Sequence, residues 1–195
     1  MTESADQSLP PSYFDEVYQA NADPWNFETS PYEAAKYAAT LAALPKPRYQ
    51  HAFEIGCSIG VLTEKLAARC DTLLSVDVAA QALNRAKIRC QHLPQVRFEL
   101  MHLPQQFPDQ QFDLIIVSEV GYYWGWAGLK RAQELIVSHL EPGGQLLLVH
   151  WTPFVPDYPL TGDQVHTAFL NDTQPQLRHL HSSRTVKYRL DLFEK

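Results

Sequence analysis

Apolar segments of strand length recur along the chain, at residues 51–55, 72–77, 96–100, 112–118 and 145–151. Several stretches between them carry apolar side chains at the spacing of an amphipathic helix, namely residues 59–69, 79–91 and 126–140. Apolar strands that alternate with amphipathic helices are typical of a parallel sheet covered by helices on both faces. The pattern therefore predicts an α/β fold.

The start of the chain departs from this alternation and predicts extra helices. Ser30-Pro31-Tyr32-Glu33 combines an N-cap serine, a proline at the first helical position and a glutamate that closes a capping box. The helix that this motif opens is predicted over residues 34–44 and stops at Pro45-Lys46-Pro47. We expect Lys36 on this helix, and Arg85 on a later one, to be solvated charges.

The end of the chain also differs from the middle. Thr161-Gly162-Asp163-Gln164 is a second capping-box opening, and its helix is predicted to reach about Leu170. Residues 177–183 and 185–193 then have the pattern of two strands joined by a short link. This arrangement predicts an antiparallel strand pair at one edge of the sheet.

The length and composition fit one globular domain. Of the 195 residues, 45% are hydrophobic and 19% are charged, which separates the chain from disordered sequences. We expect a single domain over residues 1–195, with an N-terminal helical lid over 1–47 and a Rossmann-like core over 48–195.

Charge and cysteine content narrow the expected partners. The formal net charge is -6, so the sequence shows no general footprint for nucleic acid. Its apolar runs are too short to cross a bilayer, and residues 1–12 lack the pattern of a signal peptide. Cys57, Cys70 and Cys90 form no CxxC pair, and the histidines show no metal-ligand spacing. We therefore expect a cytoplasmic protein that binds no nucleic acid, membrane or metal.

The strongest local motif is Phe53-Glu-Ile-Gly-Cys-Ser-Ile-Gly60, at a predicted turn from strand to helix. Gly56 permits a tight turn and close approach to a ligand, and Gly60 lets the next helix pack near the strand. Asp77 ends the next strand about twenty residues later, where nucleotide-binding βαβ units place a ribose-binding carboxylate. Glycines are common at such turns, but their combination with Asp77 favours a nucleotide site.

The loop also bears on which nucleotide is bound. Ser58 replaces the middle glycine of the dinucleotide fingerprint, which disfavours NAD. S-adenosylmethionine carries a positively charged sulfonium and an amino-acid tail. Glu54, beside the loop, suits the ammonium group of that tail. The motif therefore favours S-adenosylmethionine as the cofactor.

Four motifs together resemble class I S-adenosylmethionine-dependent methyltransferases: residues 54–60, Asp77, Phe112-Asp-Leu-Ile-Ile-Val-Ser-Glu119 and Leu140-Glu-Pro-Gly-Gly144. The resemblance implies a Rossmann-like fold with a mostly parallel seven-stranded sheet and an antiparallel edge pair. Within this superfamily the chain is similar to the rhizobial nodulation protein S group. The supporting segments are Asp23-Pro24-Trp25, residues 30–33, the Cys57 loop and residues 118–123. That group N-methylates the free amino sugar at the end of a deacetylated chitin oligosaccharide.

The resemblance implies a set of cofactor-binding residues: Trp25, Glu54, Gly56, Cys57, Gly60, Asp77, Val78, Met101, His102, Ser118 and Glu119. Glu54 and the loop would hold the methionine moiety, and Asp77 would hold the ribose. Met101 and His102 stand where an aspartate often binds adenine, so His102 or backbone groups would have to replace it. Ser118 and Glu119 would border the methionine carboxylate and the substrate mouth.

Candidates for the chemistry follow the fifth predicted strand. His150, at its end, is suited to accept a proton from an amine, or it is simply a strand-end histidine bonded to backbone. Asp157 and His166 are predicted to contact substrate. Asp163 lies one helical turn from His166, although the same segment would also suit a capped surface helix.

Aromatic residues offer further candidates. Tyr122 and Tyr123 follow the fourth predicted strand, where their rings would suit a sugar or a cation, or ordinary packing. Trp25 is predicted to be part of a lid over the cofactor, or to attach the N-terminal helices to the core.

The sequence therefore predicts a methyltransferase that acts on a small molecule, with an amine of an amino sugar or oligosaccharide as the leading acceptor. An O-methyltransferase would share every cofactor residue, and a non-catalytic S-adenosylmethionine-binding protein is a further alternative. An NAD-dependent oxidoreductase ranks last, since the chain leaves no room for a separate catalytic domain. Monomer and homodimer both stay open.

Overall fold

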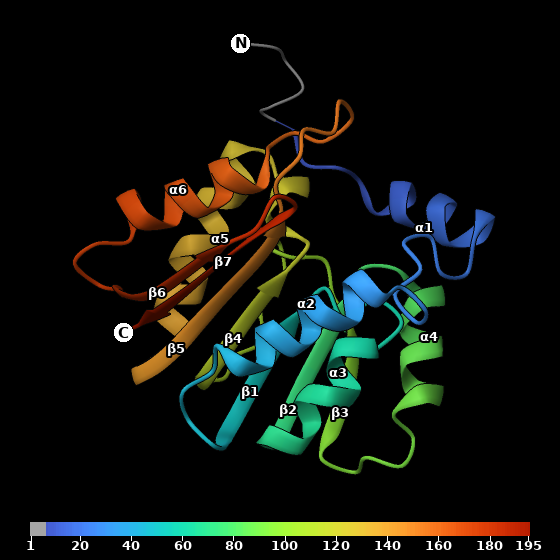
Figure 1. Ribbon diagram of the computed structural model, residues 1–195, viewed down its shortest axis with the longest axis horizontal. Helices are drawn as coiled ribbons and strands as arrows, with labels where there is room; N and C mark the ends of the chain where they lie inside the picture. The colour runs from blue at the N-terminus through green and yellow to red at the C-terminus, as the bar shows by residue number, and fades with distance from the viewer. Residues whose placement is uncertain (1–6) are drawn as a thin grey trace. The chain divides into compact units, whose positions relative to one another are not determined.

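The structure is a computed structural model that describes residues 7–195. The start of the chain, over which no signal peptide is predicted, lies partly outside the described residues. The first half of the fold consists of α1 (Pro11–Ala20), α2 (Pro31–Ala42), β1 (Tyr49–Ile55), α3 (Val61–Leu66), η2 (Ala67–Arg69), β2 (Cys70–Asp77), α4 (Ala80–Arg89) and β3 (Val96–Leu100) (Figure 1). It continues with β4 (Phe112–Ser118), η3 (Gly121–Tyr123), α5 (Trp126–His139), β5 (Leu140–Trp151), α6 (Gly162–Asp172), β6 (Arg178–Arg184) and β7 (Tyr188–Glu194).

The strand order is β3-β2-β1-β4-β5-β7-β6. β1 pairs with β2, β2 with β3 and β4 with β5, each time in parallel. β7 pairs in the antiparallel sense with both β5 and β6. The predicted mostly parallel seven-stranded sheet with an antiparallel edge pair is confirmed.

The chain divides into two compact units. One comprises Pro10–His102 and contains α1 to β3. The other comprises Leu103–Lys195 with the described residues up to Leu9, and contains β4 to β7. A single domain with a helical lid over residues 1–47 stays a prediction.

The unit from Pro10 to His102 is built on the three parallel strands β1 to β3. Helix α1 contacts α4, and α3 also packs on α4. The helix predicted over residues 59–69 begins instead at Val61 and ends as a 3-10 turn. Gly60 precedes it with a left-handed φ of 80°, a conformation that a right-handed helix cannot contain. The loop therefore extends two residues further than the apolar pattern indicates.

The unit from Leu103 to Lys195 contains the buried strand β4 and the long strand β5. The turn predicted at residues 141–144 lies within β5. Gly143 N–H donates to the carbonyl of Lys195 at 2.7 Å, and Lys195 N–H donates to the carbonyl of Gly144 at 2.9 Å. The end of the chain thus supplies the hydrogen bonds that extend the strand, a long-range partner that local turn residues do not reveal.

Helix α6 begins as the sequence predicts. Thr161 Oγ1 accepts from Gln164 N–H at 3.2 Å, and Gln164 Oε1 accepts from Thr161 N–H at 2.8 Å, which completes the capping box. The helix packs on β5 and β7, which places its buried face against the antiparallel edge of the sheet (Figure 1).

Helix α2 begins at its predicted cap, but one of its charges is not solvated. Ser30 Oγ accepts from Glu33 N–H at 3.3 Å. The Lys36 side chain is buried and donates to the Glu33 carboxylate at 3.0 Å, with its ammonium over the Tyr32 ring. The prediction that Lys36 is solvated is therefore wrong. A carboxylate three residues earlier on the same face neutralises its charge, so that burial is tolerated.

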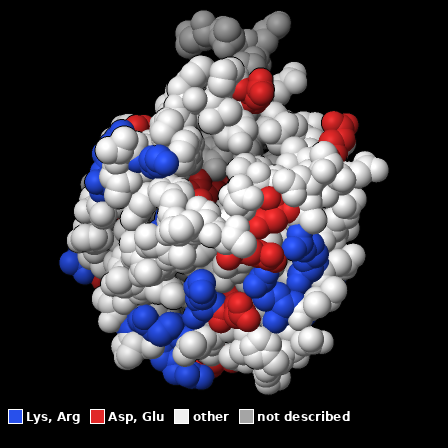
Figure 2. All heavy atoms as spheres, turned by 45° about the vertical axis from the view of Figure 1, so that its right-hand side comes forward, with Lys and Arg blue, Asp and Glu red and all other residues white. Residues whose placement is uncertain are grey.

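Acidic and basic side chains lie next to one another in the lower part of the face that Figure 2 shows. Glu28 pairs with Arg85 and Arg89 of α4, and Arg89 also approaches Glu64 at 3.7 Å. Such mutual neutralisation does not make a uniformly basic surface, but the absence of nucleic-acid binding stays a prediction. Among residues 7–195, no helix is both long enough and apolar enough to cross a membrane.

Candidate active site

The loop between β1 and α3 has an unusual backbone. Gly56, Ser58 and Gly60 all have positive φ values, of 82°, 50° and 80°. The N–H groups of Gly56 and Cys57 both donate to the carbonyl of Val76 on β2, at 2.9 and 3.0 Å. Backbone that turns this sharply at a strand end can bring its remaining amides close to a ligand.

Gly60 is required by packing as well as by conformation. A Cβ atom at this position would lie 2.9 Å from the Cβ of Ala86 and 3.0 Å from its Cα. Both atoms belong to α4, so that Gly60 lets α3 begin directly against α4. The sequence predicted that Gly60 lets this helix pack near the strand, whereas the atoms nearest to such a Cβ belong to α4.

Asp77, at the end of β2, fixes the loop through its carboxylate. Oδ2 accepts from Ser58 N–H at 2.8 Å, and Oδ1 accepts from Ala79 N–H at 2.9 Å. Burial raises the pKa of Asp77, although the bonds from Ala79 and Ser58 lower it. A carboxylate can accept about four hydrogen bonds, so it keeps acceptor capacity for a ligand.

Glu54 is a buried carboxyl group on β1. Its Oε2 accepts from Thr63 Oγ1 at 2.6 Å and from Ser75 Oγ at 2.7 Å. Burial raises its pKa from 4.5 to about 7, although both hydroxyl groups lower it. A site beside this group would favour a cation, because a positive charge stabilises the ionised carboxylate.

The N-terminal aromatic residues of this unit pack next to the loop. The ring of Trp25 lies 5.5 Å from that of Phe27 and 5.7 Å from that of Tyr18. This group packs in one cluster with Ile59, which lies in the loop itself. Tyr18 Oη also hydrogen-bonds Ser58 Oγ. Trp25 thus attaches the N-terminal segment to the loop, and its contact with a cofactor stays a prediction.

The remaining predicted cofactor residues of this unit differ in exposure. The Cys57 side chain is buried against Leu83 and Ala86, so that it packs the loop against α4. Val78, Met101 and His102 are half-buried. Met101 N–H donates to the carbonyl of Asp77 at 3.0 Å, which places the end of β3 beside the end of β2.

The other unit contains a second set of polar groups, at the end of β4. Ser118 is buried, and Glu119 follows it with a left-handed φ of 58°. Glu119 Oε2 accepts from Trp151 N–H at 2.8 Å and from Tyr122 Oη at 2.7 Å. Its carboxylate thus joins the ends of β4 and β5 and orients the first tyrosine of η3.

Three tyrosines cluster around this carboxylate. The rings of Tyr122 and Tyr158 stack at 5.1 Å with an angle of 10°, and Tyr123 packs edge-on against both. Burial and the Glu119 charge raise the pKa of Tyr122 well above 10.0, so its hydroxyl stays a donor. Tyr158 is half-buried and presents part of this aromatic cluster to the exterior.

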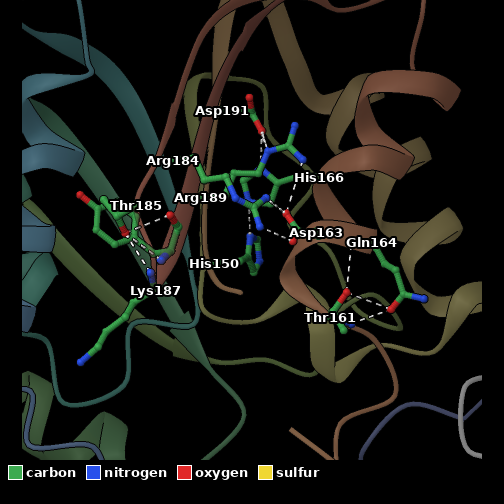
Figure 3. Close-up of polar contacts among 11 residues, drawn as sticks. His150, Thr161, Asp163, Gln164, His166, Arg184, Thr185, Lys187, Arg189 and Asp191 are labelled. Carbon is green, nitrogen blue, oxygen red and sulfur yellow. Dashed lines mark hydrogen bonds and ion pairs between the residues drawn. The ribbon is translucent and has the colours of Figure 1, made fainter. Parts of the chain in front are cut away.

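His150 and His166 meet in the interior of the same unit. His150 Nδ1 lies 3.1 Å from His166 Nε2, and His166 Nδ1 lies 2.6 Å from Asp191 Oδ2 (Figure 3). His150 Nε2 accepts from Gly121 N–H at 3.0 Å. Both rings are fully buried, with 0% exposure.

The structure thus brings together only part of the predicted catalytic set. Asp157 is exposed in the loop before α6, and within residues 7–195 it forms no hydrogen bond to either histidine. Asp163 pairs with Arg184, so that its carboxylate is part of a surface ion pair. The roles of His150, His166 and Asp157 stay predictions, and the burial of both histidines argues against direct contact with substrate.

Sequence reasoning missed Thr63, Ser75 and Asp191. Two of them carried a signal, namely a polar residue within an apolar strand. Ser75 pairs in register with Glu54, and Asp191 stands between buried leucines on β7. Buried polar groups need partners, so each position indicated a polar contact whose identity only the fold reveals.

Comparison with known proteins identifies the family. Residues 16–151 match the family described as Nodulation protein S (NodS). The chain belongs to this family. It is 34% identical to nodulation protein S of Rhizobium tropici over 127 residues. This match covers 64% of this chain and 53% of that protein. The corresponding protein of Bradyrhizobium diazoefficiens is 36% identical over 127 residues, covering 64% of this chain and 61% of that protein.

These matches span only about half to three fifths of the curated relatives. A solved structure extends the likeness over the fold. The N-methyltransferase NodS of Bradyrhizobium japonicum WM9, in complex with S-adenosyl-L-homocysteine, is 25% identical with a TM-score of 0.83. The match covers 95% of this chain and 98% of that one. The chain therefore has the class I methyltransferase fold, as predicted.

Proposed function

We propose that this chain is an S-adenosylmethionine-dependent methyltransferase that acts on an amine of a small molecule. The observation that carries the proposal is the left-handed loop after β1, which Asp77 ties to the end of β2. Membership of the nodulation protein S family and the likeness to an N-methyltransferase support the same function.

The residues of the loop fit this cofactor. Glu54 offers a buried carboxyl group whose ionised form suits an ammonium. Asp77 holds the loop amides and keeps acceptor capacity for ribose hydroxyl groups. When bound, S-adenosylmethionine supplies a methyl group on a sulfonium, whose C–S bond breaks as the acceptor's N–C bond forms. Proximity and alignment then supply most of the rate, because this leaving group is already activated.

Tyr158 and Glu119 are the residues that we propose for the acceptor. The half-buried Tyr158 ring presents an aromatic face that suits a sugar, and Glu119 can accept a hydrogen bond from an amine. An amine must lose its proton to solvent or to a base before it attacks. Ser118 and Glu119 as cofactor contacts, and a cytoplasmic location, are further parts of the proposal.

Transfer of labelled methyl from S-adenosylmethionine to matched glucosamine oligosaccharides tests the function. One acceptor carries a free terminal amine and the other is fully acetylated. Label on the free amine alone is the expected result. Label on both would favour O-methylation. If neither acceptor is labelled by protein that binds S-adenosylhomocysteine, the amino-sugar acceptor is wrong and a non-catalytic binder becomes the better explanation.

Cofactor binding is expected to depend on pH through Glu54. With a pKa of about 7, Glu54 is mostly protonated in acid, and a ligand ammonium favours its ionised form. The affinity for S-adenosylhomocysteine should therefore fall about tenfold between about pH 8 and about pH 6. Titration calorimetry across this range measures the effect.

Glu54→Gln is the matched control for this profile. The amide cannot ionise, so its affinity for S-adenosylhomocysteine should be weak and nearly independent of pH across the same range. A flat profile for the unmodified chain, or an equally steep one for the variant, would assign the titration to another group.

A further inference from the structure

A continuous chain of hydrogen bonds runs through the unit formed by β4 to β7. It begins at Asp191 on β7 and passes through His166 on α6 to His150 on β5 (Figure 3). It ends at Gly121 N–H in η3, which donates to His150 Nε2. All three side chains have 0% exposure. Four separate elements are thus joined by one buried polar network.

The network determines where each proton lies. Gly121 N–H is a donor, so His150 Nε2 must be the acceptor and lacks a proton. Neutral His150 then carries its proton on Nδ1 and donates to His166 Nε2. His166 in turn carries its proton on Nδ1 and donates to Asp191. Every donor meets one acceptor, and both rings are the Nδ1–H tautomer.

The negative charge of Asp191, at one end of this hydrogen-bond network, is stabilised by neighbouring side chains. Burial raises the pKa of Asp191, but bonds from His166 and Ser182 and the Arg189 charge lower it to about 2. His179 Nε2 donates to Oδ1 at 2.8 Å, and Arg189 Nε lies 2.7 Å from Oδ2. The carboxylate therefore stays ionised and can fix the tautomer of His166.

The other end of the hydrogen-bond network, at His150, contacts η3, the segment that carries Tyr122. A Cβ on Gly121 would lie 2.9 Å from His150 Nε2 and 2.7 Å from Val165 Cγ1, so that the backbone of η3 sits directly on the imidazole. The His150 ring also packs edge-on against the Tyr122 ring, at 5.5 Å. Moving His150 would therefore move both the amide and the ring of this segment.

We infer that Asp191, His166 and His150 are positioning residues, which hold η3 and thereby the Tyr122–Glu119 pair for the acceptor. The inference rests on the proposed function for its effect on rate, but the proton positions do not. A general base needs a free lone pair that substrate can reach, and Gly121 occupies the Nε2 lone pair of His150 inside the protein. Asp191 thus affects the reaction only indirectly, through His166 and His150.

Nitrogen NMR of the ¹⁵N-labelled full chain at neutral pH tests the proton positions directly. Two buried histidines with protonated Nδ1 and unprotonated Nε2 are expected, and His150→Gln and His166→Gln assign the signals. A protonated Nε2 on His150 would overturn the inference, whatever the catalytic activity. This measurement needs neither substrate nor turnover.

Asp191→Leu and Asp191→Asn test the effect on catalysis. Leucine leaves the Nδ1–H of His166 without its acceptor, and we expect kcat to fall about 10- to 100-fold, because small misplacements near reacting groups cost rate steeply. Asparagine keeps one carbonyl acceptor and should restore part of kcat. The affinity for S-adenosylhomocysteine should fall much less than kcat in both variants, since Glu54 and Asp77 are untouched and only the proposed cofactor contact of Glu119 is displaced.

Asp172→Asn, at the exposed end of the same helix α6, is the matched control and should keep the unmodified rate. Unchanged kcat in Asp191→Leu would overturn the positioning role. A loss of S-adenosylhomocysteine affinity as large as the loss of kcat would also overturn it, because the effect would then be general. If the unmodified chain methylates no acceptor, the proposed function fails, while the NMR result still decides the proton positions.

Discussion

Replacing Gly60 with alanine is expected to lower the free energy of unfolding by about 2 to 5 kcal/mol. Two causes add at this position. Its φ of 80° disfavours any side chain, by about 1 to 2 kcal/mol. The new Cβ would also lie 2.9 Å from the Cβ of Ala86, so that α3 and α4 must separate or strain. Equilibrium unfolding in urea measures the loss.

Gly143→Ala separates these two causes. Gly143 has a similar φ of 74°, but a Cβ there would meet no atom within 4 Å. It should therefore lose only the conformational part, about 1 to 2 kcal/mol. Equal losses in the two variants would show that contact with Ala86 contributes nothing, contrary to the packing inferred for the loop.

Replacing Asp77 with alanine is expected to weaken S-adenosylhomocysteine binding by at least about 100-fold. The carboxylate holds the amides of Ser58 and Ala79, and we propose that it also binds the ribose. Hydrogen bonds to a charged group contribute about 1.5 to 3 kcal/mol each. Losing the two bonds that we propose to the ribose hydroxyl groups therefore accounts for a factor of this size or more. Titration calorimetry gives the affinity, and thermal unfolding shows whether the variant is folded.

Asp71→Ala is the matched control, on the same strand β2. Asp71 is exposed and pairs with Arg48, an arrangement that contributes about 0 to 1 kcal/mol. Its removal should leave the affinity for S-adenosylhomocysteine unchanged. Binding by Asp77→Ala that matches this control would exclude Asp77 from the cofactor site.

The strand and helix pattern was readable from the sequence because it depends on local periodicity. β3 and β4 begin and end at their predicted residues, and the capping box at Thr161 forms as expected. The pattern failed at positions that depend on distant partners. Residues 141–144 join β5 because Lys195 bonds to them, and Lys36 is buried because Glu33 neutralises it.

The candidate site divides in the same way. Glu54, the glycine loop and Asp77 were predicted from sequence, because a nucleotide loop needs glycines and a carboxylate at fixed spacing along one βαβ unit. Ser75 and Thr63, which hold Glu54, come from other elements, and only the strand register and the start of α3 bring them to it.

The sequence by itself determined the α/β class, the glycine loop after β1 and the presence of histidines after the fifth strand. Only the tertiary structure decided which groups His150 contacts. Asp191 lies 41 residues from it and is linked to it through His166 of α6, so no local pattern could reveal that both nitrogens of His150 are already bound. Hydrogen bonds fix protons by geometry in space, whereas periodicity records only which face of an element is buried.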